Sequence, residues 1–171
     1  VSVPVDFDQL YGPGVNPPEE VFYFRYNNEN GYSLVTYYHG TDLKYCLNSG
    51  YLSNLANKNY PAIAEWDDAD FRKIFDWYTY DGLDATAGVG ALLCNKFRDS
   101  GSKNARNSCP IYKYSDVLLM YAESVCRAQN GPTEDALEAV NMIHRRAYGK
   151  PSTEKSDIDY KLSDYTRDSF I

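Results

Sequence analysis

The feature that most constrains this fold is a pair of amphipathic helices predicted between Ser115 and Tyr148. The first is expected over residues 115–129, because apolar side chains recur there at helical spacing and form one stripe. That stripe consists of Leu118, Tyr121, Ala122, Val125 and Ala128. An Asn-Gly-Pro sequence ends the helix, with Gly131 in the position that favours a left-handed cap.

The second helix begins after Thr133, whose hydroxyl is a good N-cap, and Glu134 and Asp135 place negative charge in its first turn. Its apolar stripe is predicted at Ala136, Leu137, Val140, Ile143 and Ala147. Arg145 and Arg146 fall in the last turn, where positive charge is favoured. Gly149 and Pro151 end it.

Together the two helices form an αα-hairpin of 34 residues, the length of a tetratricopeptide unit. A single unit of this kind cannot bury its apolar faces alone. The hairpin is therefore expected to stack on helices elsewhere in the protein.

The chain before the hairpin has a different pattern. Residues 21–26 and 33–38 are predicted as two short strands around an Asn-rich turn, which makes a short β-hairpin. Residues 39–61 sustain neither a helical nor a strand period and are predicted as a long loop. Asp67 and Asp68 are expected to cap a short helix over residues 69–78 with one apolar face. That face consists of Phe71, Ile74, Phe75 and Tyr78.

Tyrosine is unusually abundant, with 17 Tyr against 7 Phe and 2 Trp. A sugar ring presents C–H groups that an aromatic plane can cover, and hydroxyls that amides and charged groups can bond. Tyr combines a flat apolar face with a polar tip, and loops on rigid scaffolds commonly carry binding. The predicted ligand-binding residues lie in or beside the long loop: Tyr37, Tyr38, Tyr45, Tyr51, Tyr60 and Trp66, with Asn48, Asn54 and Asn57 nearby. Trp77 is interpreted as a core residue, and any single Tyr has the simpler interpretation of packing at the core edge.

Other classes of function find little support. The net charge is −7 without a basic stripe, which argues against nucleic acid and anionic lipid surfaces. No Gly-x-Ser-x-Gly, P-loop or dinucleotide motif is present. The acidic cluster at residues 65–70 is interpreted as a helix N-terminus rather than a catalytic carboxylate pair. Glu123 is expected to be structural, in an ion pair with Arg145 or Arg146. We therefore predict no enzyme activity and no cofactor.

Metal and disulfide sites are also weakly supported. His39 and His144 are far apart in sequence, and His144 is expected to be solvated. Cys46, Cys94, Cys109 and Cys126 show no C-x-x-C spacing, so no metal site is predicted. Isolated buried thiols are the simpler interpretation, above all for Cys126. A Cys94–Cys109 disulfide is the alternative, because these two residues flank a polar loop.

Residues 110–123, PIYKYSDVLLMYAE, resemble a hallmark of the SusD/RagB family, and residues 130–147 continue it in register. Upstream, residues 19–24, 67–72 and 95–98 resemble further family elements in the right order. The resemblance implies a mostly α fold, with long irregular loops and a short β-hairpin beside a tetratricopeptide-like helical hairpin. Within one partial domain, residues 19–109 would be the loop-rich ligand-facing part, 110–150 the hairpin, and 151–171 a polar tail. The tail would stop before the family's next helix, so the chain is interpreted as an incomplete piece of a larger α-superhelical fold.

The same resemblance implies function and location. Members are surface lipoproteins of Bacteroidetes that bind glycans and sit on a TonB-dependent outer-membrane transporter. The expected role is non-catalytic capture of a polysaccharide or oligosaccharide for that transporter, with attachment to the outer membrane through an N-terminal lipid that this chain lacks. The alternative is a tetratricopeptide-like protein-interaction module that binds no sugar. The sequence does not name the glycan.

Overall fold

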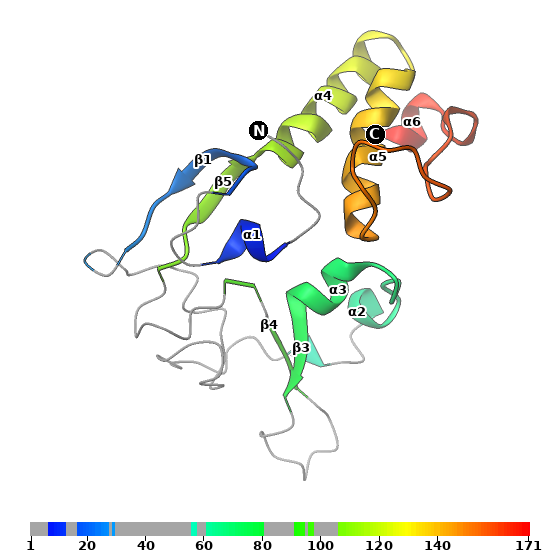
Figure 1. The fold of residues 1–171 in the computed structure, drawn as a ribbon. Helices are drawn as coiled ribbons and strands as arrows, with labels where there is room; N and C mark the ends of the chain where they lie inside the picture. The colour runs from blue at the N-terminus through cyan, green and yellow to red at the C-terminus, as the bar shows by residue number, and fades with distance from the viewer. Residues whose placement is uncertain are drawn as a thin grey trace. The chain divides into compact units, whose positions relative to one another are not determined.

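The computed structural model describes residues 7–12, 17–27, 29, 56–57, 61–80, 91–94, 96–97 and 106–171 of the chain. The chain divides into two compact units, each with its own contacts. Unit 1 comprises Val1–Asp6, Pro18–Phe22 and Pro110–Ile171, and unit 2 comprises Phe7–Pro17 and Tyr23–Cys109. Helices dominate the described part and are accompanied by two small sheets (Figure 1), which confirms the predicted fold class.

The predicted helical hairpin is the centre of unit 1. Helix α4 spans Tyr114–Ala128 and helix α5 spans Glu134–Ala147, and the two lie side by side (Figure 1). Thr133 caps α5 as predicted, because its Oγ1 accepts a hydrogen bond of 3.2 Å from the backbone N–H of Ala136. The left-handed residue after α4 is Asn130, with φ 56°, and not Gly131. Asn tolerates this conformation better than most residues, and the N–H of Gly131 still bonds back to the Cys126 carbonyl at 2.9 Å.

Small side chains form the seam between the two helices. Ala122, Ala136 and Ala139 are buried together, and Leu118, Val125, Val140 and Phe170 pack around them. The predicted stripe of α4 is wrong at Tyr121, which is 46% exposed, and at Ala128, which is also exposed. Successive residues of a helix are separated by about 100°, so turning Ala122 toward α5 carries Tyr121 off the seam.

The sheet formed by β1 and β5 adjoins the hairpin. Strand β1 spans Glu20–Phe24 and pairs with β5, Cys109–Lys113. This confirms the strand predicted at residues 21–26, whereas the second predicted strand, residues 33–38, lies outside the described residues. The carbonyl of Glu19, just before β1, accepts a 2.7 Å hydrogen bond from the N–H of Tyr114 at the start of α4.

Unit 2 is built from short elements. Helix α1 (Asp8–Tyr11) carries a small core of Phe7, Leu10 and Tyr11, against which Phe75 and Phe97 pack. Helix α2 spans Pro61–Ala64 and α3 spans Phe71–Asp76. Strands β2 (Ala56–Asn57), β4 (Ala91–Cys94) and β3 (Trp77–Tyr80) form an antiparallel sheet in that spatial order.

The predicted helix over residues 69–78 is wrong in its extent and in its face. Helix α3 ends at Asp76, and the next four residues, Trp-Tyr-Thr-Tyr, form a strand that pairs with β4. Aromatic residues and Thr favour strands, and the available ladder partner outweighs the helical period. On α3, Phe71 and Ile74 are 50% and 67% exposed, whereas Phe75 stacks on Phe7 with ring centroids 5.4 Å apart.

Residues 151–171 fold back on the hairpin. They include a short 3-10 helix, η3 (Leu162–Asp164), and the helix α6 (Arg167–Phe170), which Thr166 caps. Phe170 of α6 packs against the alanine seam of the hairpin, so this segment is part of the fold of unit 1.

The predicted Cys94–Cys109 disulfide is wrong, because Cys109 is a free thiol. The two residues belong to different sheets, β4 and β5. Cys126 is free and fully buried, as predicted.

Candidate functional site

Most of the predicted ligand-binding residues lie outside the described part of the chain. These are Tyr37, Tyr38, Tyr45, Tyr51 and Tyr60, together with the nearby Asn48 and Asn54. The backbone of Asn57 lies in β2, opposite Ala91. Trp66 is the one predicted ligand-binding residue whose surroundings can be described.

Trp66 lies in the turn between α2 and α3, where its side chain is half-buried. Its indole Nε1–H donates to the Asp70 carboxylate at 3.0 Å, and its carbonyl accepts from the Lys73 ammonium at 2.7 Å. The Arg72 guanidinium lies 5.9 Å from the ring centroid, within the range of a cation–π contact. The indole is therefore held rigidly, with a cation already beside its ring.

Asp70 organises this cluster. Its side chain is almost fully buried and receives the Arg72 guanidinium in a forked arrangement, with N–O distances of 2.5–3.0 Å. Burial raises the pKa of Asp70, but hydrogen bonds from Arg72 and Trp66 outweigh that effect and leave the pKa below its ordinary value. Asp70 also accepts a hydrogen bond from the backbone N–H of Arg72, so it caps α3 in place of the predicted Asp67 and Asp68. The Asp70 carboxylate is therefore occupied by structural hydrogen bonds, which agrees with the non-catalytic interpretation of the acidic cluster.

Unit 1 contains two buried arginines, Arg145 and Arg146, which lie in the last turn of α5 as predicted. Arg145 is fully buried and bonds to Glu138 at 2.7 and 2.9 Å and to Asp159 at 2.5 and 2.6 Å. Those two carboxylates raise the pKa of Arg145 above its ordinary value. Arg146 forms an ion pair with the buried Glu19. The predicted pairing of Glu123 with one of these arginines is wrong, since Glu123 pairs with Arg127 one turn along α4 at 2.8 Å.

An aromatic cluster lies beside Arg145. The His144 ring lies 4.1 Å from the Tyr160 ring and 4.8 Å from the Tyr148 ring, measured between centroids. Tyr165 then meets Tyr160 edge-on at 5.8 Å. His144 is therefore half-buried among rings, and its predicted solvated position is wrong. These contacts attach the segment after α5 to the helix.

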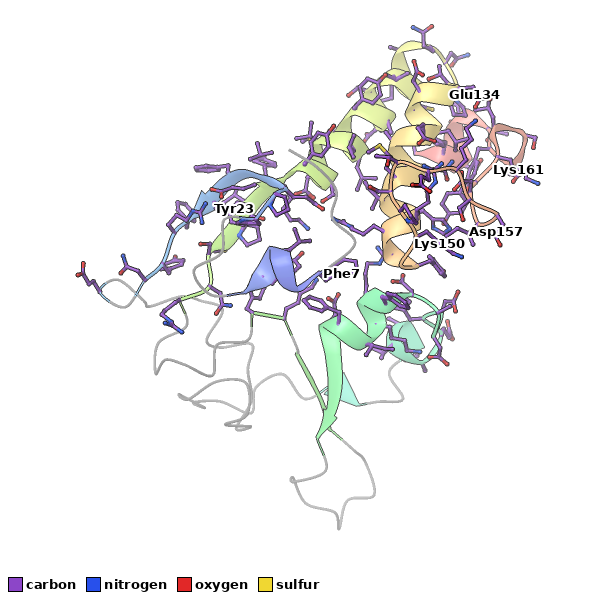
Figure 2. All side chains as sticks on the ribbon, viewed as in Figure 1. Phe7, Tyr23, Glu134, Lys150, Asp157 and Lys161 are labelled. Carbon is purple, nitrogen blue, oxygen red and sulfur yellow. The ribbon has the colours of Figure 1, made fainter. Side chains whose placement is uncertain are left out.

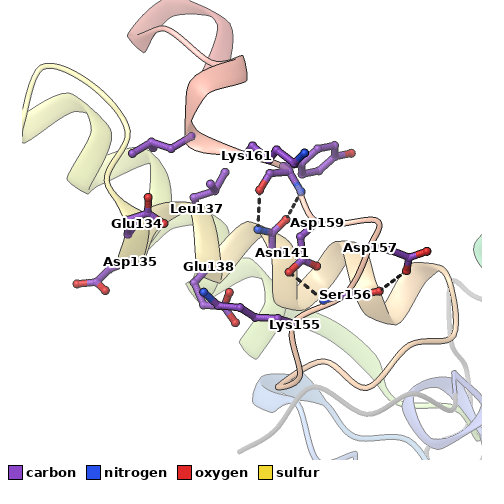
Figure 3. Close-up of a pocket in the computed structure, with 12 residues that line it drawn as sticks. Glu134, Asp135, Leu137, Glu138, Asn141, Lys155, Ser156, Asp157, Asp159 and Lys161 are labelled. Carbon is purple, nitrogen blue, oxygen red and sulfur yellow. Dashed lines mark hydrogen bonds between the residues drawn. The ribbon is translucent and has the colours of Figure 1, made fainter.

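A pocket of about 670 Å³ lies between the N-terminal half of α5 and the segment 155–162 (Figure 3). In Figure 3, Glu134 lies at one end and the pair Ser156 and Asp157 at the other. Both sides are rich in polar groups, and Figure 2 shows Lys161 and Asp157 on the segment that faces α5. The lining residues are Glu134, Asp135, Leu137, Glu138, Asn141, Lys155, Ser156, Asp157, Asp159, Tyr160, Lys161 and Leu162.

The sequence interpretation missed this pocket. Asn141 links the two sides of the pocket, because its side-chain amide N–H donates to the carbonyl of Tyr160 at 3.1 Å and its oxygen accepts from the N–H of Tyr160 at 2.8 Å. A polar residue on the apolar side of a predicted helix was the available signal. The return of residues 155–162 over α5 has no periodic signature in the sequence.

In the part of the chain that the structure describes, no group of three or more His, Cys, Asp or Glu residues is placed to hold a metal ion. Across the same residues, no helix has the length and apolar character required to cross a membrane.

Comparison with known proteins identifies the family to which this chain belongs. The SusD family model matches residues 21–171, and the chain belongs to this family. No curated protein sequence matches it.

Solved structures of the same superfamily share the fold. A SusD superfamily protein from Parabacteroides distasonis aligns over 99% of this chain with a TM-score of 0.68 and 18% sequence identity. NanU of B. fragilis aligns over 95% with a TM-score of 0.66 and 21% identity, and a SusD superfamily protein from Bacteroides vulgatus over 95% with 0.64 and 19%. The chain spans 38%, 39% and 40% of the lengths of those three structures.

Proposed function

We propose that this protein captures a polysaccharide or oligosaccharide at the cell surface, without cleaving it, and delivers it to a TonB-dependent outer-membrane transporter. The observation that carries the proposal is the SusD family match over residues 21–171. Within unit 1, the helical hairpin is a rigid element, with Thr133 capping α5 and alanines in the seam, and loops on rigid scaffolds commonly carry binding. A lipid anchor on the outer membrane completes the proposed location.

The proposed primary contact surface is the Tyr-rich loop, with Trp66 at its edge. Tyr37, Tyr38, Tyr45, Tyr51 and Tyr60 would stack on sugar rings and hydrogen-bond at their rims. Trp66 fits a platform role, since the hydrogen bond to Asp70 fixes the orientation of its ring and Lys73 holds its backbone carbonyl. Affinity is expected to be modest, because sugar hydroxyls exchange hydrogen bonds with water for hydrogen bonds with protein.

One set of contacts among the described residues supports the proposed absence of hydrolysis. A glycosidase needs two carboxyl groups that flank one bond and are available to it. The Asp70 carboxylate, in the densest acidic cluster of the sequence, is already engaged by Arg72 and by Trp66. A residue held in that way supports a helix and an aromatic ring rather than proton transfer.

The first test is replacement of Tyr37, Tyr38 and Tyr51 together by Ala in the intact protein. Glycan binding, measured by affinity gel electrophoresis against a panel of polysaccharides, should be lost while the helical circular dichroism is retained. Normal binding by this triple variant would show that the proposed loop is not the contact surface.

Trp66 allows a matched pair of variants. Trp66→Phe keeps an aromatic plane but removes the hydrogen bond to Asp70, whereas Trp66→Ala removes both. If Trp66 is a platform, the Phe variant should retain most of the affinity and the Ala variant should lose it. Equal affinity in both variants would restrict Trp66 to its structural role.

One observation favours the interaction-module alternative. Leu119, Met120 and Tyr121 are 47%, 48% and 46% exposed on α4, which leaves an exposed apolar surface over about 200° of the helix circumference in the described part of unit 1. Such a face packs on other helices in repeat proteins, and this packing is compatible with glycan capture by the loops.

A further inference from the structure

The pocket of unit 1 has walls that are fixed in place. Asn141 is 4% exposed, and its amide holds both backbone groups of Tyr160. Arg145, fully buried behind the pocket, ties Glu138 on α5 to Asp159 on the opposite segment. The two sides are therefore joined at two points. A site joined in this way is preorganised, which reduces the entropy lost on binding.

The size and the lining suit a small polar ligand. A volume of about 670 Å³ falls within the range of about 300–1,000 Å³ typical of small-molecule pockets. Leu137 and Leu162 contribute apolar surface among the polar groups. This combination of apolar patches with surrounding hydrogen-bonding groups matches the faces and rim of a sugar ring.

Several charged groups of the lining have no partner among the described residues. Glu134 and Asp135 on α5, and Lys155 and Lys161 on the opposite segment, form no ion pair or side-chain hydrogen bond within that part of the chain. Carboxylates accept hydrogen bonds from hydroxyl or ammonium groups, and lysines donate to hydroxyl oxygens. Both sides of the pocket can therefore bond to one polyhydroxylated ligand.

The pocket lining carries an excess of negative charge, which selects among ligands by their charge. Five carboxylates face two lysines, and the buried Arg145 offsets only part of that excess. An anionic ligand entering the pocket would meet like charge, which disfavours binding. A neutral sugar meets no such repulsion, and the positively charged amino group of an amino sugar is attracted to the carboxylates.

We propose that this pocket is a second saccharide-binding site, separate from the Tyr-rich loop, which accepts neutral or amino sugar units and rejects anionic ones. This inference rests on the proposed function only for the class of ligand. The pocket and the loop consist of different residues, so an experiment can disprove one site without disproving the other.

The test uses backbone-amide NMR of the intact protein titrated with three trisaccharides: chitosan trimer, maltotriose and trigalacturonate. Chitosan trimer and maltotriose should shift the amides of residues 134–141 and 155–162, with the larger affinity for chitosan trimer. Trigalacturonate should leave those amides unchanged. Binding of either accepted sugar without shifts in these residues, or shifts there with trigalacturonate, would overturn the second site while leaving glycan capture by the loop intact. Absence of binding by all three sugars would also overturn the pocket proposal, and the loop would still be tested by the polysaccharide panel.

A double variant, Glu134→Gln with Asp135→Asn, removes two negative charges from the rim. Its affinity for chitosan trimer should fall roughly three- to tenfold while maltotriose changes little, because only the charge interaction is lost. Glu154→Gln is the matched control, since Glu154 is exposed on the same returning segment and does not line the pocket. An unchanged affinity for chitosan trimer in the double variant, with circular dichroism intact, contradicts the charge selectivity.

Discussion

Arg145 is the residue on which the described part of unit 1 most depends. It lies fully buried, bonds to Glu138 on its own helix, and joins α5 to the segment that follows through Asp159 and the carbonyl of Ser152, the latter at 3.0 Å. The planar guanidinium uses its five N–H donors in five hydrogen bonds, two to each carboxylate and one to the Ser152 carbonyl, whereas the ammonium of Lys has only three donors and no fork. Arg145 is therefore specified by geometry as well as by charge.

Replacement of Arg145 by Lys should destabilise unit 1 by about 3 kcal/mol, near the lower end for breaking a buried pair, because Glu138 retains solvent contact. The free energy of unfolding in urea measures the effect. Arg127→Lys, at an exposed i,i+4 pair on α4, is the control and should cost less than about 0.5 kcal/mol. A similar loss in both variants would contradict the special role of Arg145.

The ion pair between Arg145 and Asp159 is expected to depend on pH. The hydrogen bonds from Arg145 hold the pKa of Asp159 below its ordinary value. A depressed carboxyl pKa contributes stability above the unfolded value of about 3.9, and that contribution is lost as pH falls through the folded value. Amide hydrogen exchange of residues 152–160 should therefore accelerate below about pH 4, beyond its intrinsic change with pH. Asp159→Asn should remove this acid-dependent step, whereas Glu154→Gln should leave it in place.

Among the secondary-structure elements, the sequence predicted the helices that have a repeating apolar pattern and residues that mark where each helix starts and stops. The hairpin is confirmed to within a residue or two at its ends, because Thr133 and the Asn-Gly-Pro turn define local geometry without help from the rest of the chain. The end of α3 and the pairing of β3 with β4 were not predictable in the same way. They depend on a strand partner that begins eleven residues later in the sequence, at Ala91.

Burial within the hairpin can be tested at Leu137, which is 3% exposed. Leu137→Ala should lower the free energy of unfolding by about 2–5 kcal/mol, through lost apolar contact and a residual cavity. Leu119→Ala, with a side chain 47% exposed on α4, should cost much less in the same chain. Comparable losses in urea unfolding would contradict the burial of Leu137 in the fold of unit 1.

At the scale of the whole molecule, family membership was predictable from residues 110–147 alone, since that motif is long and specific. Much of the candidate site was not predictable in the same way. The Tyr residues were chosen by the chemistry of their side chains, and five of them lie outside the described residues. The pocket arises from Asn141 and Arg145 bonding to residues 14 to 19 positions further along the chain, a contact that periodicity does not encode.

The central claim is that this SusD family protein captures glycan and does not cleave it. The most direct measurement incubates the intact protein with each polysaccharide that it retards in affinity gels, and then assays the mixture for new reducing ends. We predict retardation by at least one polysaccharide, with reducing ends no higher than in the polysaccharide alone. Release of reducing ends that scales with protein concentration, or no retardation by any polysaccharide, would contradict the account.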